Sequence, residues 1–466
     1  MDEAAFIAKC REVLGPKGLI TDKADMRQYC TDWRGMFKGD ALAVALPADR
    51  EQVSKIVQNC AGAGIAIVPS GGNTGLAGGS IPDHTGRQLV LSLARMNKIR
   101  SIDTLAQTME VEAGCILAVA QEAAQNDDLM LPISFAAEGS AQIGGVIATN
   151  AGGINVVRYG MARQRILGLE VVLADGRIVS GLRHLQKDNA GYDWKHWFIG
   201  TEGTLAVVTA AVLQLTSRPR YVETALLCVP SVEAAFQCLR ETRRAVGETI
   251  CAFEFMSRDA VDRVVELLGH RRLVASSPWY VLIEAASALP GLNNAFGEFL
   301  DDQLSAGTVS DGIIAGSEQQ RKEIWRLRES LTEAEAKAGR SVKHDISVPI
   351  SALANFLTIA EEQVKSLFPD VRLNIFGHMG DGNIHFNALA DTRTDADDLN
   401  RCVHDLVIAT GGSISAEHGI GQYRASEMSR LSSEAELELA SRMKRTFDPH
   451  NLLNPGKIFS ASRSGH

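Results

Sequence analysis

Short apolar runs alternate with amphipathic segments along the first half of the chain. Residues 1–40 carry apolar positions at helical spacing, which predicts an amphipathic helical lead-in. Farther on, two apolar runs joined by an Asp-Gly turn predict a hairpin. Strands are expected at residues 41–47, 65–69, 88–93, 108–111, 169–174 and 177–180, and helices at residues 51–61 and 114–124. This order is an αβ pattern.

The pattern changes at about residue 219. Strand and helix signals alternate there without glycine-rich loops, which favours a separate α+β domain. Residues 291–360 carry long helical periodicity. The alternating segments are residues 224–229, 232–239, 252–256, 261–268 and 279–285.

Two glycine-rich segments lie in the first half of the chain. Residues 70–79, SGGNTGLAGG, hold five glycines in ten residues and directly follow a predicted strand. Glycine lets backbone N–H groups approach an anion, and successive N–H groups form a nest of phosphate size. The segment matches neither the Rossmann nor the P-loop pattern, and a flexible linker is the alternative. Residues 138–160, EGSAQIGGVIATNAGGINVVRYG, again favour close approach to a ligand, with a tightly packed helix start as the alternative.

The composition is that of an ordinary globular protein. Of 466 residues, 45% are hydrophobic and 22% are charged, and the length allows two or three domains. The formal net charge of −9 argues against a nucleic-acid-binding protein. It leaves an anionic substrate open, because a local cluster of Arg and Lys can dominate a pocket.

The eight cysteines are scattered, and no two have a C-x-x-C spacing. We therefore expect neither an iron–sulfur cluster nor a zinc ribbon, and dispersed thiols fit a reducing compartment. The first residues, MDEAAFIAKC, show no signal peptide, and no apolar run reaches the length of a transmembrane helix. The expected location is the cytoplasm.

Residues 374–387, NIFGHMGDGNIHFN, combine two apolar runs with a glycine-rich turn and two histidines. The Asp-Gly and Gly-Asn steps suit a chain reversal that brings His378 and His385 to one point, as a divalent metal requires. Farther along, AEHGIG supplies Glu417 as a candidate third ligand and His418 as a candidate base. Two His and one carboxylate with a position left open are typical of a catalytic metal site. The alternative is a glycine-rich turn with two exposed histidines.

The segment WRLRESLTEAEA contains a candidate anion site. Arg328 and Thr332 are four residues apart, so a helix would present both on one face, and Lys343 follows after a break at Gly339. Arginine binds a carboxylate through two N–H groups, and lysine acts as a point charge. The alternative is a solvated helix face of mixed charge.

Several long motifs together resemble a known family. PSGGNTGLAGG, GGVIATNAGG and FIGTEGTLAVVT occur in the order typical of FAD-binding domains of the vanillyl-alcohol-oxidase type, over roughly residues 40–217. GHMGDGNIH, AEHGIG and FDPHNLLNPGKIF are similar to motifs of the flavin-dependent D-2-hydroxyacid dehydrogenases. That group includes D-2-hydroxyglutarate dehydrogenases, D-lactate dehydrogenases and glycolate oxidase D-subunit relatives. The resemblance covers essentially the whole chain.

The resemblance implies an α+β fold with three parts. Residues 1–218 would form a two-subdomain FAD-binding domain of the vanillyl-alcohol-oxidase type. Residues 219–421 would form an α+β substrate-binding cap domain that contains the metal site. Residues 422–466 would form a C-terminal helical segment that packs back on the FAD-binding domain.

The resemblance also implies which residues bind the cofactor. The first glycine-rich loop would wrap the FAD pyrophosphate, the second segment would line the cofactor, and Glu202 with its neighbours would close over it. Some relatives attach FAD covalently through a histidine in the first loop. Here that loop holds no histidine, since His84 lies beyond it, so we expect non-covalent FAD. The expected cofactor-binding residues are Pro69, Ser70, Gly71, Gly72, Asn73, Thr74, Gly75, Gly78, Gly79, Ser80, Gly139, Ser140, Gly144, Gly145, Asn150, Gly153, Glu202, Gly203, Val208 and Asn454.

For the metal, the resemblance implies His378, His385 and Glu417 as ligands and Zn²⁺ as the ion. A dication stabilises the alkoxide of a bound hydroxyacid, and His418 is the implied general base. Hydride would then pass from substrate C2 to flavin N5, and a 2-oxoacid would leave. A metal-free interpretation stays open, in which His418 acts as base alone and the other two histidines donate hydrogen bonds.

The implied substrate is a D-2-hydroxyacid, with D-2-hydroxyglutarate ahead of D-lactate. Arg328, Thr332 and Lys343 are the implied carboxylate-binding residues, and they offer more cationic capacity than one carboxylate needs. Asn387 is the implied polar contact to substrate or flavin. A D-lactate or glycolate dehydrogenase of the same fold is the alternative. An alternative of another class is a non-catalytic flavoprotein subunit of an electron-transfer complex.

The expected partners are small or diffusible. Without cluster cysteines, the reduced flavin must pass electrons to a diffusible acceptor such as a quinone or an electron-transfer flavoprotein. A homodimer is the expectation from base rates. No nucleic-acid partner is expected.

Overall fold

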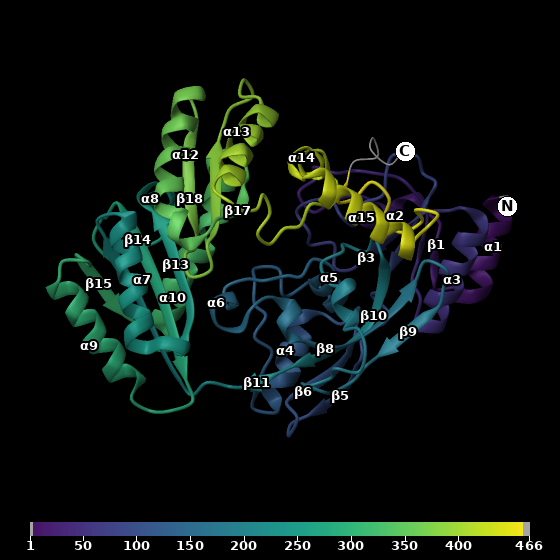
Figure 1. Cartoon of the computed structure of the whole chain (residues 1–466), viewed down its shortest axis with the longest axis horizontal. Helices are drawn as coiled ribbons and strands as arrows, with labels where there is room; N and C mark the ends of the chain where they lie inside the picture. The colour runs from purple at the N-terminus through teal and green to yellow at the C-terminus, as the bar shows by residue number, and fades with distance from the viewer. Residues whose placement is uncertain (1–2, 460–466) are drawn as a thin grey trace. The chain divides into compact units, whose positions relative to one another are not determined.

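The computed structural model describes residues 3–459, and its contacts divide the chain into two compact units (Figure 1). Unit 1 comprises the described residues up to Gly152, Met161–Ser217 and the part from His418 onward. Unit 2 comprises Gly153–Gly160 and Arg218–Glu417. The three-part division expected from the sequence stays a prediction.

The first subdomain of unit 1 is built on a four-stranded sheet. Its strands are β1 (Leu19–Ile20), β2 (Ala41–Ala45), β3 (Ile67–Ser70) and β4 (Gln88–Ser92), and its helices are α1 (Glu3–Leu14), α2 (Lys23–Cys30) and α3 (Arg50–Ala63). The strand order is β1-β2-β4-β3, with β2, β4 and β3 parallel and β1 antiparallel to β2. α3 is capped by Asp49 at its start and by Gly64 at its end. Gly64 has a left-handed φ of +67°, a conformation that residues with a side chain rarely adopt. The predicted strand–helix–strand order is confirmed here.

The second subdomain of unit 1 is an antiparallel sheet. Its strands are β5 (Ile99–Asp103), β6 (Thr108–Glu112), β8 (Ile166–Leu173), β9 (Ile178–Gly181) and β10 (Ala206–Gln214), in the order β5-β6-β10-β8-β9. Short elements complete it: α4 (Leu117–Asn126), β7 (Leu129–Met130), α5 (Ile143–Ala148), η1 (Ala162–Arg165), η2 (Trp194–Trp197) and β11 (Thr216–Ser217). One buried apolar cluster contains residues of both sheets, α3 and α4. The predicted hairpin is the β8–β9 pair.

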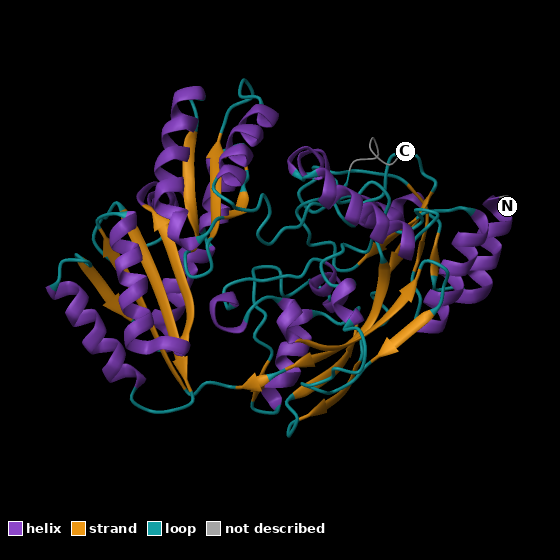
Figure 2. Cartoon of the chain, in the orientation of Figure 1, coloured by secondary structure: helices purple, strands orange, loops and turns teal. Residues whose placement is uncertain are grey.

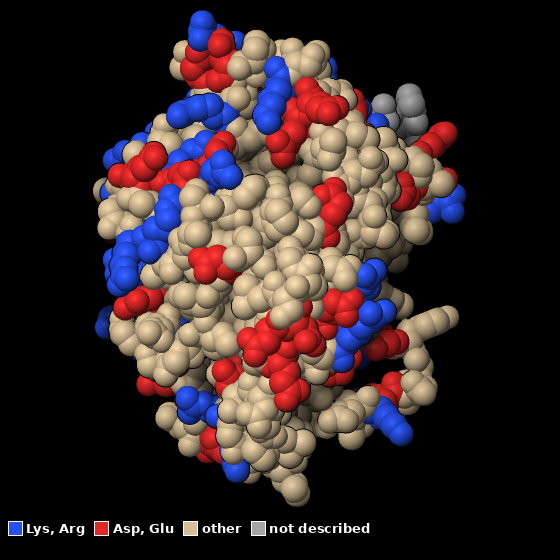
Figure 3. Space-filling model, turned by 90° about the vertical axis from the view of Figure 1, so that its left-hand side faces the viewer, with Lys and Arg blue, Asp and Glu red and all other residues tan. Residues whose placement is uncertain are grey.

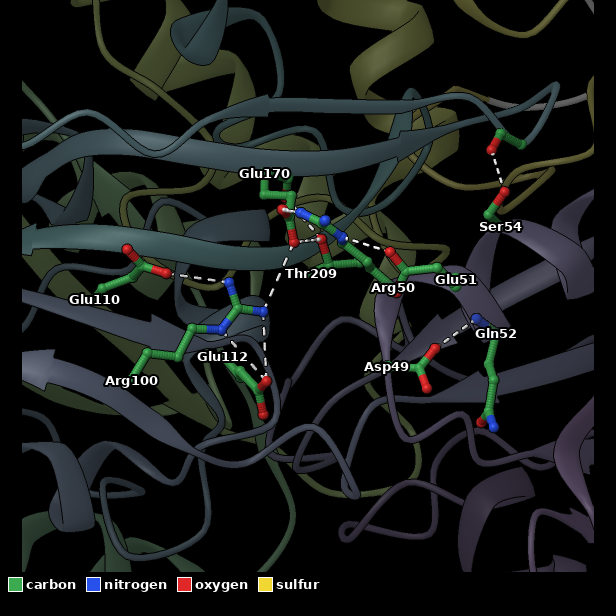
Figure 4. A network of polar contacts seen from close by, with 11 residues as sticks. Asp49, Arg50, Glu51, Gln52, Ser54, Arg100, Glu110, Glu112, Glu170 and Thr209 are labelled. Atoms are coloured by element: carbon green, nitrogen blue, oxygen red, sulfur yellow. Dashed lines mark hydrogen bonds and ion pairs between the residues drawn. The ribbon is translucent and has the colours of Figure 1, made fainter.

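A buried carboxylate ties α3 to the second sheet (Figure 4). Glu170 on β8 is fully buried and accepts hydrogen bonds from Arg50 at 2.6 Å and from Thr209 Oγ1 at 3.0 Å. Arg100 on β5 lies 3.8 Å away. Glu170 is therefore paired with arginines from two elements, and its contact with Arg50 joins α3 to the sheet.

The C-terminal part of unit 1 returns to the first sheet. It contains α14 (Ala425–Leu431) and α15 (Glu434–Phe447), the second of which begins with a capping box between Ser433 and Glu436. Beyond α15, the Ile67 N–H donates to the Leu452 carbonyl at 2.7 Å, and Leu453 is fully buried in the unit 1 core. The C-terminal segment therefore packs on the first sheet, and its role in an FAD-binding domain stays a prediction.

Unit 2 is an antiparallel sheet covered by helices. Its strands are β12 (Tyr221–Val229), β13 (Ile250–Ser257), β14 (Trp279–Ser287), β15 (Asp311–Ile314), β16 (Ser341–Val342), β17 (Asp345–Ser347), β18 (Arg372–His378) and β19 (Asn383–Leu389). The order is β15-β12-β14-β13-β18-β19-β16, and β17 also pairs with β19. β14 lies between β12 and β13 and is antiparallel to both. The predicted βαβ-like run is therefore a split unit with a third strand inserted.

The helices of unit 2 are α6 (Val156–Tyr159), α7 (Val232–Val246), η3 (Gly247–Thr249), α8 (Arg258–Leu268), α9 (Leu292–Ser305), α10 (Glu318–Glu329), α11 (Leu331–Ala338), η4 (Ile350–Ala352), α12 (Leu353–Leu367) and α13 (Ala396–Ala409). α7 packs beside α9, and α12 beside α13 (Figure 2). The long helical periodicity of residues 291–360 corresponds to shorter helices, interrupted by β15, β16 and β17. The segment expected as one helix around Arg328 is two helices, because Ser330 ends α10 and precedes α11.

The surface carries both positive and negative side chains. Basic and acidic side chains are intermingled on the face that Figure 3 shows, and several pair along helices, as Arg244 does with Glu241 at 3.1 Å. Within residues 3–459, no helix combines the length and the apolar character needed to cross a bilayer.

Candidate active site

The two histidines of the glycine-rich turn come together on a hairpin in unit 2. His378 ends β18, and residue Phe376 on the same strand pairs with His385 of β19. Because His378 and Phe376 are two residues apart, both project to the face of the sheet that holds His385. The two imidazole centroids are 5.7 Å apart. In the turn, Gly382 has a φ of +86°, and an added Cβ would lie 2.4 Å from the Val348 carbonyl, so this reversal requires glycine.

Glu417 completes a set of three candidate ligands. One ligand atom each of His378, His385 and Glu417 lies within 4.8 Å of the others, and His378 Nε2 is 3.8 Å from Glu417 Oε1. Two backbone groups hold this carboxylate and its peptide. The Gly153 N–H donates to Glu417 Oε1 at 2.8 Å, and the Glu417 N–H donates to Asp345 at 2.9 Å. Two imidazole nitrogens and a carboxylate form a donor set that Zn²⁺ prefers.

Acidic side chains surround these ligands. Glu254 Oε1 lies 2.6 Å from His378 Nδ1, and Asp345 Oδ1 lies 3.7 Å from His385 Nδ1. Burial raises the pKa of the Glu417 carboxyl to about 7, with Asp345 and Asp381 adding to the rise. It also raises the pKa of Asp381, in the turn, to about 6.

The surrounding negative charge also acts on His378, where it favours the charged imidazolium. Burial disfavours its charged form, but the adjacent Glu254 outweighs burial and raises the pKa of His378 to about 9. The cluster therefore retains protons near neutral pH. Four carboxylates around two imidazoles and one guanidinium (Glu254, Asp345, Asp381 and Glu417 around His378, His385 and Arg328) are better balanced by a dication. The donor set and its charge fit a divalent metal.

The expected carboxylate-binding residues occupy different environments in unit 2. Arg328 on α10 is buried and donates through Nε to Glu254 at 2.8 Å, while its guanidinium lies 4.9 Å from the Phe376 ring centroid. Thr332 on α11 is exposed, because the break at Ser330 separates the two helices. Lys343 Nζ lies 3.4 Å from Glu335. Arg328 alone of the three lies against the residues around His378; the role of all three stays a prediction.

Asn387 is engaged by the protein. Its Nδ2 donates to Glu335 at 2.7 Å, and its Oδ1 accepts the His344 N–H at 3.1 Å. Glu335 is fully buried and also accepts from Asn374 Nδ2 at 2.8 Å. Glu335 thus organises the polar interior beside Lys343, and contact of Asn387 with a ligand stays a prediction.

The glycine-rich loops of unit 1 pack against one another through their backbones. A Cβ on Gly72 would lie 2.0 Å from the Ser140 carbonyl oxygen, and a Cβ on Gly203 would lie 3.0 Å from Pro69 Cγ. Asn454 joins these loops, since its Nδ2 donates to the carbonyl of Gly79 at 2.9 Å and to that of Glu202 at 2.7 Å. The structure thereby brings together segments that are far apart in the sequence.

The same loops present open backbone and unused polar atoms. An added Cβ would meet no atom within 4 Å at Gly75, Gly139 and Gly145. Among the buried side-chain oxygens that have no hydrogen-bond partner within residues 3–459, three belong to these loops and to the residue that joins them: Ser70 Oγ, Gln142 Oε1 and Asn454 Oδ1. Glycine backbone open to close approach and buried polar atoms without partners fit a polar cofactor such as FAD.

Other expected cofactor-binding residues have partners within the protein. Ser80 Oγ donates to Asn73 Oδ1 at 2.9 Å, and Asn150 Oδ1 accepts the Arg163 N–H at 2.9 Å. Gly153 belongs to unit 2, where its N–H donates to Glu417. The others lie at the end of β3, in the loop after it, in or just before α5, or in β10: Pro69, Ser70, Gly71, Thr74, Gly78, Gly139, Gly144 and Val208. Their contact with FAD stays a prediction.

His418 follows Glu417 in the chain and begins the C-terminal part of unit 1. The next residues are fixed by Glu202, whose carboxylate accepts the N–H groups of Ile420 and Gly421, each at 2.8 Å. Burial raises the pKa of the Glu202 carboxyl. Glu202 therefore anchors the loop that carries His418.

Four acids near the candidate ligands and Lys343 were not predicted as site residues from the sequence: Glu254, Asp345, Asp381 and Glu335. Asp381 is half-buried and the other three are buried, and Glu254 is a lone charged residue within the apolar run of β13. Burying an unpaired acid in such a run costs free energy. The sequence pattern could therefore have indicated Glu254 as a paired, candidate site residue.

Comparison with known proteins identifies both parts of the chain. The family model described as "FAD binding domain" matches residues 41–181, and the model described as "FAD linked oxidases, C-terminal domain" matches residues 218–458. A D-2-hydroxyglutarate dehydrogenase from Xanthomonas citri is 38% identical over 448 residues, covering 95% of this chain and 94% of the relative. A putative mitochondrial D-lactate dehydrogenase from Schizosaccharomyces pombe is 35% identical, covering 94% of this chain and 85% of that one.

The fold has a counterpart among solved structures. The structure of p-cresol methylhydroxylase with substrate bound superposes with a TM-score of 0.77 at 18% sequence identity, covering 99% of this chain and 97% of that chain. The expected fold, of the vanillyl-alcohol-oxidase type, is confirmed. The chain is an oxidoreductase that belongs to the FAD-linked oxidases, within their group of FAD-dependent D-2-hydroxyacid dehydrogenases.

Proposed function

We propose that this enzyme oxidises a D-2-hydroxyacid to the 2-oxoacid with FAD and a divalent metal, and that D-2-hydroxyglutarate is the preferred substrate. The observation that carries the proposal is the convergence of His378, His385 and Glu417 within 4.8 Å, amid an excess of carboxylates. A structural zinc site is normally closed by four protein ligands, whereas three ligands are typical of a site that also receives substrate or water. Zn²⁺ is the proposed ion because it prefers nitrogen donors.

The bound groups supply the redox and electrostatic chemistry: FAD is a two-electron acceptor, and a dication lowers the pKa of an adjacent hydroxyl. His418 is the proposed acceptor of the hydroxyl proton, since imidazole titrates near neutral pH and the residue directly follows Glu417 in the chain. Glu202 supports this role by fixing the loop after His418.

Arg328 is proposed to orient the substrate carboxylate. Its Nε and Nη2 are used by Glu254, at 2.8 and 2.7 Å, so Nη1 is the nitrogen assigned to substrate. Lys343, with Thr332 and Asn387, is proposed to bind a second carboxylate. A dicarboxylic substrate therefore suits the chain better than a monocarboxylic one, which favours D-2-hydroxyglutarate.

D-lactate is the second candidate substrate, favoured by one relative whose name is a putative D-lactate dehydrogenase. In that case the Lys343 region binds no carboxylate. Non-covalent FAD and a diffusible electron acceptor, a quinone or an electron-transfer flavoprotein, complete the proposal.

Anaerobic reduction of the flavin tests the proposal. The FAD-loaded protein is mixed with D- and L-2-hydroxyacids, and bleaching of flavin absorbance near 450 nm is followed before and after EDTA. We expect bleaching by D-2-hydroxyglutarate, loss of bleaching after EDTA, and recovery with zinc. Equal bleaching by the fully metal-free protein would remove the metal from the mechanism. No bleaching by any hydroxyacid would favour a non-catalytic flavoprotein subunit.

A further inference from the structure

We propose that Glu254 is a positioning residue that holds the metal ligand His378 and the substrate-binding Arg328 in one arrangement. The inference rests on the proposed function, in which these two residues have those roles. Glu254 is 1% exposed and lies in the middle of β13. It is the direct cross-strand partner of His378 on β18, so the sheet register itself sets this contact.

One oxygen of Glu254 faces His378. Glu254 Oε1 lies 2.6 Å from Nδ1, which leaves Nε2, 3.8 Å from Glu417, as the nitrogen that faces the other candidate ligands. A carboxylate on the second nitrogen fixes the tautomer and the ring orientation of a metal-ligating histidine and makes it a stronger donor. Glu254 is therefore placed to strengthen metal binding without touching the metal.

The other oxygen of Glu254 faces Arg328. Arg328 approaches Oε2 through Nε at 2.8 Å and Nη2 at 2.7 Å. Its guanidinium also lies over Phe376, whose ring centroid is 4.8 Å from that of His385. The guanidinium is thus fixed from two sides, and a shift of Glu254 moves both the histidine and the arginine.

Glu284 in the same sheet provides a matched control. It lies on β14, the neighbouring strand of β13, and is 7% exposed. It accepts hydrogen bonds from Arg321 at 2.7 Å and from Trp325 at 2.7 Å, both on α10, which also carries Arg328. Among residues 3–459, the side chains that donate hydrogen bonds to Glu284 belong to Thr224, Arg321 and Trp325, and none is a histidine. Glu284 therefore has the burial and the arginine pairing of Glu254 without the link to a candidate metal ligand.

The test compares E254Q, E254D and E284Q in the FAD-loaded protein. Zinc affinity is measured by competition with a chromogenic chelator, and the Co²⁺-loaded protein is examined by visible absorption, which reports ligand geometry. We expect E254Q to bind zinc 10- to 100-fold more weakly, with a changed cobalt spectrum. E254D keeps the charge and should recover part of the affinity. E284Q should bind zinc as the parent does, although it is also destabilised.

Steady-state kinetics give the second readout. E254Q should raise KM for the hydroxyacid as well as lower kcat, because Arg328 loses its anchor, whereas a purely structural role would leave KM unchanged in the folded fraction. Should E254Q fail to fold because it strands a buried guanidinium, the double variant E254Q/R328M removes that charge and its zinc affinity decides the question.

The outcomes separate this inference from the proposed function. A parent that binds zinc and reduces its flavin, together with an E254Q variant of unchanged zinc affinity and cobalt spectrum, overturns the role of Glu254 alone. A parent that binds no divalent metal overturns the metal site itself, and the positioning role with it. Equal loss of zinc affinity in E254Q and E284Q would also contradict the inference, because it would show a general effect of destabilisation.

Discussion

Each unit of this protein contains a buried glutamate paired with arginine, yet the two have different further partners. In unit 1, Glu170 is held by Arg50 and by Thr209, which join α3 to the second sheet (Figure 4). In unit 2, Glu254 is held by Arg328 and faces His378. The two glutamates are therefore alike in burial and in pairing with arginine. They differ in the other partner, which is Thr209 for Glu170 and His378 for Glu254.

The difference shows how a functional acid can be told from a structural one. Glu170 faces two arginines, and the same arginines also pair with Glu51, Glu110 and Glu112. Glu254 belongs to a group of four carboxylates that one nearby arginine and two imidazoles do not balance. Carboxylates beside imidazoles form a donor set that a divalent cation can bind, whereas carboxylates that face guanidinium groups do not.

The largest expected effect comes from removing a candidate ligand. H385A leaves two ligands, so we expect loss of stoichiometric zinc and a fall of roughly 1000-fold in the rate of flavin reduction, because a metal supplies several kcal/mol of charge stabilisation. Metal analysis and anaerobic stopped-flow absorbance check this. H184A is the control: His184 lies in unit 1 beside Thr108, at 2.8 Å, and should leave both quantities unchanged. An H385A variant of parental rate would contradict the assignment of the ligands.

A second prediction concerns the loops of unit 1, which depend on backbone packing. G72A places a Cβ 2.0 Å from the Ser140 carbonyl, so the two loops must separate, at a cost of several kcal/mol. We expect G72A to retain little FAD, as read from the flavin-to-protein absorbance ratio. G62A is the control, because a Cβ on Gly62 in α3 meets no atom within 4 Å and alanine favours the helix. Normal FAD content in G72A would contradict the packing described.

A third prediction isolates the structural glutamate. E170Q weakens the contacts of Arg50 and Arg100 and should lower the free energy of unfolding by about 2 kcal/mol, since one partner is half-exposed. Denaturant unfolding measures this change. Zinc affinity should stay at the parental value, in contrast to E254Q. A loss of zinc affinity in E170Q would erase the distinction between the two glutamates.

The most gradual effect is a pH dependence of stability at Lys457, which is spread over several pH units. Burial lowers the pKa of its ammonium from 10.5 to about 8, although it donates to the Ile81 carbonyl at 2.8 Å. Between these pH values the unfolded chain holds a proton that the folded chain has released, so this group makes stability rise with pH. The slope is at most about 1.4 kcal/mol per pH unit. Below pH 8 both states are protonated, and the full penalty for burying the charge applies.

K457M should remove this slope. The comparison is the difference in unfolding free energy between the variant and the parent, measured at intervals from pH 7 to pH 10. We expect the advantage of K457M to be largest at pH 7 and to shrink above pH 8. A constant difference over the range would show that Lys457 is not buried as a strained cation.

Local patterns predicted most of the secondary structure and the hairpin that carries His378 and His385. The turn residues Asp381 and Gly382 favour reversal, and once β18 and β19 pair, alternation places His378 and His385 on one face. The long helix predicted around Arg328 is interrupted at Ser330, which separates α10 from α11. Helical spacing predicts that Arg328 and Thr332 share one helix face. In the structure, Arg328 is buried and Thr332 is exposed.

The supporting acids could not be assigned from spacing because their partners are remote in the sequence. Glu254 and His378 meet through the pairing of β13 with β18, and Glu202 meets the loop after His418 through the return of the C-terminal segment. Such contacts depend on tertiary topology. Of Glu254 and Glu202, Glu254 is the one whose position is unusual in the sequence, because it is a lone acid inside the apolar run of β13.

A zinc titration of the metal-free, FAD-loaded protein shows whether flavin reduction depends on a metal bound at His378, His385 and Glu417. D-2-hydroxyglutarate is added under anaerobic conditions at each zinc concentration, and the amplitude of flavin reduction is recorded. We predict that the amplitude rises in proportion to zinc and saturates at one ion per chain, with no rise in H385A. Full reduction in the protein before any zinc is added would contradict the claim that the cluster at His378, His385 and Glu417 is a catalytic metal site.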